Sequence, residues 1–425
     1  MSQYRAYPAY KDSGVEWIAQ VPEHWKVARV KRLASLRNER RNDVSTDTIY
    51  IGLEDVEAGS GQYKPTNGSS RQSEDSTVGI FYEGDVLYGK LRPYLRKAII
   101  SEMAGCCSTE FLVLRAEKTE PRWLQEWLLT PDVTHQIVSG CEGAKMPRAD
   151  WWHIGSIEVV YPAQLEQAQI LATLDRETAR IDALIEKKTR FIELLKEKRQ
   201  ALIIHAVTKG LDPNAKMKDS GIEWIGQVPE HWEVNPFFAL VTELNRKNVG
   251  LVETNILSLS YGNIIQKPET RNMGLTPESY ATYQIVESGE IVFRFTDLQN
   301  DKRSLRSAQV MQRGIITSAY MAVKPQNIDS TYFSWLMRSY DLCKVFYAMG
   351  GGLRQSLKFE DVRRLPVLIP PVDEQSEITN TIKAGTARID ALVDKTEQSI
   401  TLLKERRAVF ITAAVTGQID LRGKQ

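Results

Sequence analysis

A seven-residue stretch occurs twice in this chain. Residues 178–184 read Thr-Ala-Arg-Ile-Asp-Ala-Leu, and residues 386–392 repeat them letter for letter. Each copy lies in a proline-free run whose apolar residues recur at three-, four- and seven-residue steps, which places them on one helical face. Each run is long enough to form a helix of roughly 60 Å. One such helix cannot bury its apolar stripe by itself. The repeat predicts two long helices packed together as an elongated spine, although imperfect heptads leave open two helices that each pack on a separate domain.

The apolar stripe can be followed along both runs without an insertion. In the first run it consists of Ile170, Leu174, Ile181, Leu184, Phe191, Leu195 and Leu202, and in the second of Ile378, Ile382, Ile389, Leu392, Leu403 and Phe410. The spacing predicts helices over residues 164–208 and 372–416.

A second and longer repeat precedes each helix. Residues 11–25 return almost unchanged as residues 218–232, and both copies contain the sequence Val-Pro-Glu-His-Trp. The period is too long for a solenoid. It fits two tandem copies of one globular domain, each followed by one helix.

Between these markers the two copies differ in sequence but keep the same order of features. Strand-like runs occur at 84–88 and 289–293, at 108–114 and 317–323, and before prolines at 159–162 and 367–371, and short helices surround Trp127 and Trp335. The expected fold class is α+β, with two similar globular domains joined by two long helices in an antiparallel coiled coil, and with internal pseudo-twofold symmetry. The expected segments are domain 1 at 1–163, helix 1 at 164–208, a linker at 209–217, domain 2 at 218–371, helix 2 at 372–416 and a tail at 417–425.

Composition narrows the class of protein. The 425 residues are 42% hydrophobic and 26% charged, as in globular proteins, and the net charge of +1 argues against a uniformly basic nucleic-acid coat without excluding local basic faces. The four cysteines have neither CxxC spacing nor histidine partners, so no metal site is expected. The polar start and the lack of long apolar stretches indicate a cytoplasmic protein without membrane contact.

Two diverged domains on an antiparallel spine would act as the two protomers of a dimer do. Symmetric dimers are a common solution for contacting DNA at two half-sites. A single chain with two different domains would therefore read a split, asymmetric site.

Several repeated motifs resemble those of one known family. They are Gly-Val/Ile-Glu-Trp-Ile at 14–18 and 221–225, Val-Pro-Glu-His-Trp at 21–25 and 228–232, a proline followed by Glu166-Gln167 or Glu374-Gln375, the Ile-Asp-Ala-Leu helix, and the Leu-Leu-Lys-Glu to Ala-Val-Thr ending. With these motifs, nearly the whole chain resembles the specificity subunits of Type I restriction-modification enzymes.

This resemblance implies a function and a set of partners. It implies two target recognition domains that each read half of a split site in double-stranded DNA, and no catalytic centre or bound cofactor in this chain. The implied partners are two methyltransferase subunits and, in the full complex, two restriction subunits. S-adenosylmethionine, ATP and magnesium are expected on those partner subunits.

The candidate DNA contacts lie in a basic and aromatic stretch of each copy, in polar loops that could read bases (Arg71 and Arg271), and beside a turn where Lys145, Arg148, Arg354 and Lys358 are available for the DNA backbone. Their cations suit phosphates, and an arginine fork suits a guanine edge. In the first copy the candidates are Arg71, Tyr88, Lys90, Arg92, Arg96, Lys97, Lys145 and Arg148, and in the second they are Arg271, Arg294, Lys302, Arg303, Arg306, Arg354 and Lys358. Solvated charged hairpins and ordinary surface loops would look similar.

A second set of residues forms the candidate partner interface. It comprises Arg180, Asp182, Arg388 and Asp390 in the repeated helix stretch, together with Trp17 and Trp224. The repetition of Arg-Ile-Asp exceeds what helix solubility requires, although plain solvated faces and packing tryptophans are the alternatives. His24 and His231, in identical contexts, are expected to be structural.

Two other classes of protein remain as alternatives. Residues 235–238, Asn-Pro-Phe-Phe, partly match the motif with which adenine methylases hold a flipped base, and residues 131–132 with 186–188 partly match a nuclease pattern. The first match lacks its second proline and the second falls within the predicted helix, so a stand-alone methylase or nuclease is the weaker hypothesis. A coiled-coil scaffold that does not touch DNA is the other alternative.

Overall fold

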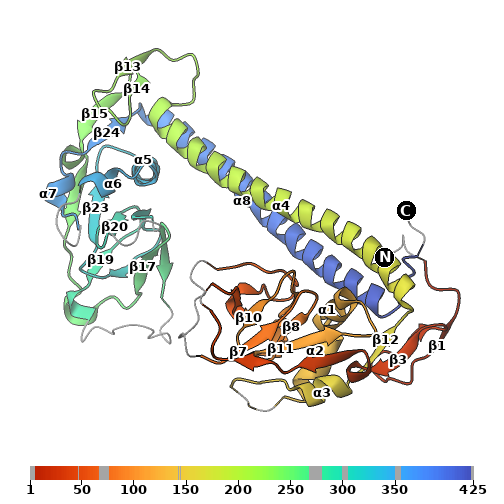
Figure 1. Ribbon diagram of the computed structural model, residues 1–425. Coiled ribbons are helices and arrows are strands. Elements are labelled where there is room, and N and C mark those ends of the chain that lie inside the picture. The colour runs from red at the N-terminus through yellow and green to blue at the C-terminus, as the bar shows by residue number, and fades with distance from the viewer. Residues whose placement is uncertain are drawn as a thin grey trace. The chain divides into compact units, whose positions relative to one another are not determined.

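The computed structural model describes residues 5–45, 47–66, 76–141, 143, 145–267, 280–298, 305–349 and 356–422. It forms two compact units, residues 1–188 with 398–425, and residues 189–397. Two long helices, α4 (Gln164–Lys209) and α8 (Val372–Val415), each have residues in both units (Figure 1). Both helices begin and end within one residue of their predicted limits.

The first globular domain is built on two four-stranded sheets. One has the order β4 (Ala34–Arg37), β11 (Phe111–Ala116), β8 (Val86–Gly89) and β9 (Ala98–Ile100), all antiparallel. The other has the order β5 (Arg40–Arg41), β7 (Val78–Phe81), β10 (Gly105–Cys107) and β6 (Tyr50–Ile51), with one parallel pair, β10 and β6. Two further pairs are β1 (Tyr10–Asp12) with β2 (Gln20–Pro22), and β3 (Lys26–Arg29) with β12 (Glu158–Tyr161).

Helices cover the first sheet of this domain. They are α1 (Pro121–Leu129), α2 (Pro131–Ser139) and α3 (Trp151–Ser156). Trp127 and Leu128 of α1 and Ile137 of α2 pack with Tyr88 and Leu114 of the sheet in one buried cluster. The predicted strands at 84–88, 108–114 and 159–162 and the helix around Trp127 are all present.

The second globular domain repeats the main sheet of the first. The order is β16 (Val241–Leu244), β23 (Met321–Pro325), β20 (Ile291–Phe293) and β21 (Ser307–Gln309), again antiparallel. The remaining strands pair as β13 (Met217–Asp219) with β14 (Gln227–Pro229), β15 (Glu233–Pro236) with β24 (Pro366–Ile369), β17 (Leu257–Ser260) with β18 (Asn263–Gln266), and β19 (Gln284–Val286) with β22 (Gly314–Ile316). Its helices are α5 (Ser330–Leu342), α6 (Val345–Met349) and α7 (Phe359–Val362). Two copies of one α+β fold are therefore present, as the repeat predicts.

The two long helices pack against each other in both units. In the first unit Ile170 and Leu174 of α4 share a buried cluster with Phe410 and Ile411 of α8. In the second unit Ile203 and Val207, near the end of α4, share one with Ile378 and Ile382, near the start of α8. The beginning of one helix thus meets the end of the other, so the pair is antiparallel.

The repeated stretch supplies an ion pair in each unit. Asp182 of α4 accepts from Arg407 of α8 at 3.0 Å, and Asp390 of α8 accepts from Arg199 of α4 at 2.9 Å. Each repeated aspartate therefore binds an arginine of the other helix, which accounts for part of the exact repetition. Ion pairs that remain partly exposed contribute little stability, but they favour one register of the helices.

The predicted stripe is not buried along its whole length. Ile170, Leu174, Ile378 and Ile382 are in the core, whereas Leu184, Phe191 and Leu392 are each at least 40% exposed. Ile192 is buried in place of Phe191, so the prediction for Phe191 was one residue out of register.

The start of each long helix is held by one carboxylate. Glu166 accepts from the indole nitrogen of Trp25 at 3.2 Å and lies 2.8 Å from Nε2 of His24. Glu374 makes the same contacts with Trp232 at 3.1 Å and with His231 at 2.7 Å. The Val-Pro-Glu-His-Trp motif and the Glu-Gln helix start are therefore two halves of one contact, which we call the helix-start clamp.

The neighbouring glutamine fixes the rest of the domain to the same helix turn. Gln167 accepts from the backbone nitrogen of Glu120 at 2.9 Å and donates to the carbonyl of Pro162 at 3.0 Å. Gln375 repeats both bonds, with Asp329 at 2.8 Å and Pro370 at 2.9 Å.

The C-terminal residues are not a free tail. Ile419 and Leu421 are buried in the core of the first unit, and the backbone nitrogen of Asp420 donates to the carbonyl of Arg5 at 2.8 Å. The expectation of a tail from residue 417 was therefore wrong for residues 417–422, because two apolar side chains in a polar stretch were overlooked. Among the described residues no helix has the length and apolar character needed to cross a membrane.

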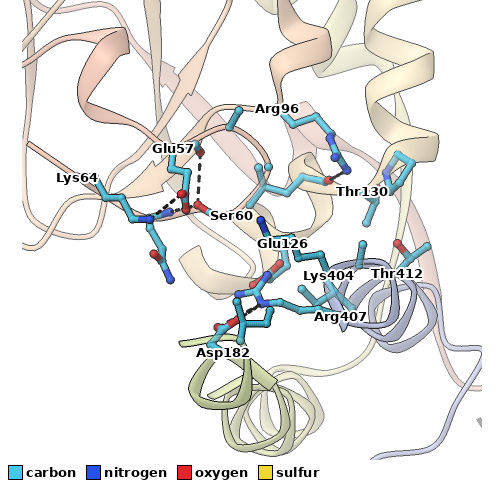
Figure 2. Close-up of a pocket in the computed structure, with 18 of the residues that line it drawn as sticks. Glu57, Ser60, Lys64, Arg96, Glu126, Thr130, Asp182, Lys404, Arg407 and Thr412 are labelled. Atoms are coloured by element: carbon cyan, nitrogen blue, oxygen red, sulfur yellow. Dashed lines mark hydrogen bonds and ion pairs between the residues drawn. The ribbon is translucent and has the colours of Figure 1, made fainter. Parts of the chain in front are cut away.

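A cavity of about 680 Å³ lies between the first domain and the helix pair (Figure 2). Its lining includes charged residues of both signs, among them Lys64, Glu126, Asp182 and Arg407. The Glu126 side chain is only 2% exposed and binds Arg122 at 2.5 Å. Burial raises the pKa of Glu126, opposed by the charges of Arg122 and Arg407 and reinforced by Asp175 and Asp182.

We predict that the helix-start clamp stabilises each unit. Replacing Glu374 with alanine should lower the free energy of unfolding by about 1–3 kcal/mol, because the buried indole of Trp232 loses its acceptor. Glu377→Ala, an exposed change on the same helix, is the matched control. Chemical denaturation of the two variants measures the difference, and equal stabilities would contradict the assignment.

A second prediction concerns the buried carboxyl of Glu126. Its folded-state pKa is raised, so the protonated form favours folding and stability falls as pH rises above the ordinary glutamate pKa of about 4.3. Glu126→Gln removes this dependence, whereas the exposed change Glu83→Gln should retain it. Thermal unfolding between pH 5 and pH 8 tests this. A constant difference between wild type and Glu126→Gln at every pH would refute it.

Candidate nucleic-acid interface

The connection between β8 and β9 in the first domain presents two arginines in an unusual conformation. It contains a short 3-10 helix, η3 (Pro93–Leu95), flanked by Arg92 with φ +53° and Arg96 with φ +50°. A left-handed backbone is uncommon for residues other than glycine, asparagine and aspartate, and such residues cluster at functional sites. Arg92 is exposed, whereas Arg96 is half-buried and donates to the carbonyl of Leu129.

A distant segment pairs with this connection. The backbone nitrogen of Arg92 donates to the carbonyl of Pro147 at 2.8 Å, and that of Ala149 donates to the carbonyl of Lys90 at 2.9 Å. Lys90 and Arg92 are thereby brought beside Lys145 and Arg148. We call these four cations the basic cluster.

One member of the basic cluster is held by a carboxylate that the sequence did not single out. Arg148 donates to Glu110 from Nε at 3.1 Å and from Nη2 at 3.2 Å, and these hydrogen bonds raise the pKa of Arg148. In the described part of the chain, Lys90, Arg92 and Lys145 form no ion pair. The cluster thus combines one oriented guanidinium with three cations that are available to phosphates.

Two predicted contact residues lie in the core instead. The ring of Tyr88 is fully buried, because β8 is a central strand covered on both sides. Arg306 is also fully buried, and its guanidinium donates to the carbonyls of Thr296 at 3.0 Å and Asp297 at 3.2 Å. Neither side chain can reach DNA, so both assignments were wrong. Arg306 instead fixes the residues that follow β20.

Lys97 also has a structural contact. Its Nζ donates to the carbonyl of Leu53 at 2.6 Å. Its position in the first domain corresponds to that of Arg306 in the second, because the carbonyl of Lys97 accepts from Gly89 and that of Arg306 accepts from Arg294. Both cations therefore bind backbone carbonyls of their own domain, Lys97 at Leu53 and Arg306 at Thr296 and Asp297.

The second domain is described less completely at this place. Arg294 is half-buried and Lys358 is exposed, and the backbone nitrogen of Leu357 donates to the carbonyl of Phe295, as Ala149 does to Lys90. The other candidates, Arg271, Lys302, Arg303 and Arg354, lie outside the described residues, as does Arg71 of the first domain. The two domains therefore share the framework of the interface.

The candidate partner residues differ in how far they are engaged. Arg180 and Arg388 are exposed, and Arg180 binds only Glu177 of its own helix at 2.8 Å. Trp17 packs 6.2 Å from the ring of Trp127, and Trp224 lies 4.5 Å from Tyr340 while remaining 40% exposed. Both tryptophans have packing contacts, and a role for either in partner binding stays a prediction.

The residues that partly match methylase and nuclease motifs lie in a strand, in the core or in a long helix. Asn235 and Pro236 belong to β15, and Phe237 is buried 6.0 Å from Phe293 and 5.8 Å from Phe333, as a core segment would be. Residues 186–188 lie within α4. In the described ranges no group of three His, Cys, Asp or Glu side chains could hold a metal ion.

Comparison with known proteins gives matches in both sequence and structure. No protein-family model matches the chain. The chain is 23% identical over 175 residues to the specificity subunit of the Type I restriction enzyme EcoDI from Escherichia coli, an alignment that spans 40% of this chain and 39% of that protein. Less than half of the relative's length is therefore covered.

Two solved structures match over nearly the full chain. A chain in a structure of a type I restriction-modification system has a TM-score of 0.69 and 14% identity, with 95% of this chain and 99% of that chain covered. The HsdS subunit from Thermoanaerobacter tengcongensis has a TM-score of 0.54 and 15% identity, with 94% and 98% covered. The chain has the fold of an HsdS subunit, which confirms the resemblance that the repeated motifs indicate.

Proposed function

We propose that this chain is the DNA-recognition subunit of a Type I restriction-modification complex. Each globular domain reads one half of a split, asymmetric site in double-stranded DNA, and the two long helices join the two readers. The chain itself has no catalytic role. Because such a subunit works on DNA, its place is the bacterial cytoplasm.

The observation that carries this proposal is the duplicated domain with its basic strand connection. Both domains have the same order of strands in the main sheet, and in both a returning segment pairs with the end of the central strand. The framework is shared, whereas the residues at corresponding positions differ, since Lys90 is partly exposed and its counterpart Phe295 lies in the core. A shared framework with different side chains suits two readers of different base sequences.

The partners follow from the likeness to specificity subunits. Two methyltransferase subunits dock on this chain, and two restriction subunits join the full complex. S-adenosylmethionine, ATP and magnesium belong to those subunits, and this chain holds none of them.

The helices offer a surface for the methyltransferase subunits. Arg180 and Arg388 are exposed at equivalent places in the repeated stretch, and exposed apolar side chains, Leu184, Phe191 and Leu392, lie along the same helices. Exposed apolar residues rimmed by charges are typical of protein interfaces. Repetition of the surface would let two copies of one partner bind in the same way.

We predict that Arg148 contributes to reading a base. Arg148→Ala in the complex with methyltransferase subunits should weaken binding to specific DNA by about 1–3 kcal/mol and relax the preference at one position of one half-site. Glu110→Gln should also relax that position, because the guanidinium loses its orienting carboxylate. Binding to partly randomised duplexes measures both effects.

Controls separate this role from a general loss of charge. Lys11→Ala removes an exposed cation of the same domain and should leave the preference unchanged. An equal loss on every sequence for Arg148→Ala would assign this residue to a phosphate instead. Unchanged binding in both variants, with the fold intact, would remove the basic cluster from the interface.

We further predict that helix length sets the spacer between the half-sites. Inserting four residues after Lys188 and four after Glu397 adds about one turn to each helix where it passes between the units. The complex should then select the same half-sites at a different separation. Altered half-sites at the original separation would contradict this role of the helices.

A further inference from the structure

An exposed tryptophan lies beside a lysine in the first domain. Trp152, on α3, is 84% exposed, and Nζ of Lys31 lies 5.5 Å from the centroid of its ring. Lys31 belongs to η1 (Val30–Arg32), a 3-10 helix after β3. Tryptophan is on average well buried in folded proteins, so a ring exposed to this degree needs an explanation.

The second domain has the same kind of pair at the same place. Phe238, on η4 (Phe237–Ala239) after β15, is 47% exposed, and Cζ of Arg363 lies 5.4 Å from its ring centroid. The two locations correspond, because Val30 donates to the carbonyl of Ile157 at 3.0 Å and Phe237 donates to that of Leu365 at 2.8 Å. The ring and the cation have changed sides between the domains. In the first the ring comes from the segment before β12, and in the second it comes from the 3-10 helix.

This exchange indicates that both domains keep a cation beside an exposed ring, whichever residues supply them. Two domains that diverged by chance alone would have little reason to keep an exposed ring under a cation while exchanging the elements that supply them. Core packing does not explain the pair, since Trp152 is mostly in solvent and Phe238 is about half exposed. A feature common to both domains also cannot distinguish two half-sites. It suits a ligand that both domains share.

The charges around each pair are mainly positive. Arg29 and Arg32 are exposed beside Lys31, and Lys358 and Arg364 are exposed near Arg363. The neighbouring carboxylates are engaged locally. Asp150 accepts from the backbone of His153, Asp361 accepts from the backbone of Lys358, and Glu360 binds Arg363 at 2.8 Å. The shared ligand is therefore anionic.

In the first domain the pair of Lys31 and Trp152 is close to the basic cluster. Trp152 follows Arg148 by four residues, so their Cα atoms are at most about 14 Å apart. In the second domain Lys358 immediately precedes α7, and Arg363 immediately follows it. A DNA duplex bound at the cluster extends well beyond that distance, since one turn is about 34 Å long.

We propose that these two cation-covered rings, Lys31 with Trp152 and Arg363 with Phe238, contact the DNA backbone beside each half-site. The cation contacts a phosphate, which for Arg363 replaces its exposed ion pair with Glu360, and the ring offers an apolar face to the deoxyribose. The proposal rests on the proposed DNA-reading function and adds a sequence-independent contact that each domain makes in the same way.

The test uses the chain assembled with its methyltransferase subunits. Binding to cognate and unrelated duplexes is measured at several salt concentrations for Lys31→Ala with Trp152→Ala, and for Phe238→Ala with Arg363→Ala. Each double variant should weaken binding to both duplexes about three- to tenfold, and lower the slope of log K against log salt by about one. The base preference should stay unchanged. Lys11→Ala is the control for loss of an exposed cation, and thermal unfolding verifies the fold.

An exchange variant sharpens the test. Lys31→Trp combined with Trp152→Lys reproduces in the first domain the arrangement of the second, so its affinity should stay within about twofold of wild type. Unchanged affinity and salt slope in the alanine variants would overturn the proposal. So would a defect confined to assembly with the methyltransferase subunits, which would make the pairs a protein contact. Failure of the wild-type complex to prefer any sequence would instead reject the proposed function.

Discussion

Each globular domain depends on one carboxylate at the start of a long helix. Glu166 and Glu374 are largely removed from water, and such a group is costly unless its oxygens accept hydrogen bonds. The His-Trp pair supplies the donors, and in the first unit the hydroxyl of Tyr7 adds another while the Arg422 cation lies 3.7 Å away. The next residue of each helix, Gln167 or Gln375, binds the carbonyl of the proline that follows β12 or β24 and the backbone just before α1 or α5. The clamp and this glutamine together therefore fix a whole domain to one helix turn. The position of the basic strand connection relative to its helix therefore follows from this contact.

The two copies also show which parts of the chain have common tasks and which have separate ones. The clamp, the ion pairs of Asp182 and Asp390 and the order of the main sheet recur with the same residue types. The strand connections differ, since Lys90 is partly exposed whereas its counterpart Phe295 lies in the core. The cation-covered ring is an intermediate case. Each domain has one cation over one aromatic ring, but the elements that supply the cation and the ring are exchanged. Divergence of this graded kind is expected when two domains share a scaffold and partners but read different bases.

Much of the fold could be predicted from the sequence, because it depends on periodicity and repetition along the chain. The limits of both long helices and the main strands are examples. The site was predicted less well. Arg148 was a candidate, but its partner Glu110 belongs to a distant segment and carries no local signal. Tyr88 and Arg306 resembled surface contacts, yet β8 is buried on both faces and the guanidinium of Arg306 is satisfied by backbone carbonyls. Burial of a polar residue depends on tertiary contacts that composition does not reveal.

The central claim is that one chain reads two separate pieces of DNA. Selection from a pool of randomised duplexes by the chain, assembled with the methyltransferase subunits proposed as its partners, tests it most directly. The account predicts two short blocks of fixed and different sequence, separated by a spacer of constant length without base preference. A single continuous block, two blocks at variable separation, or no enrichment would contradict it.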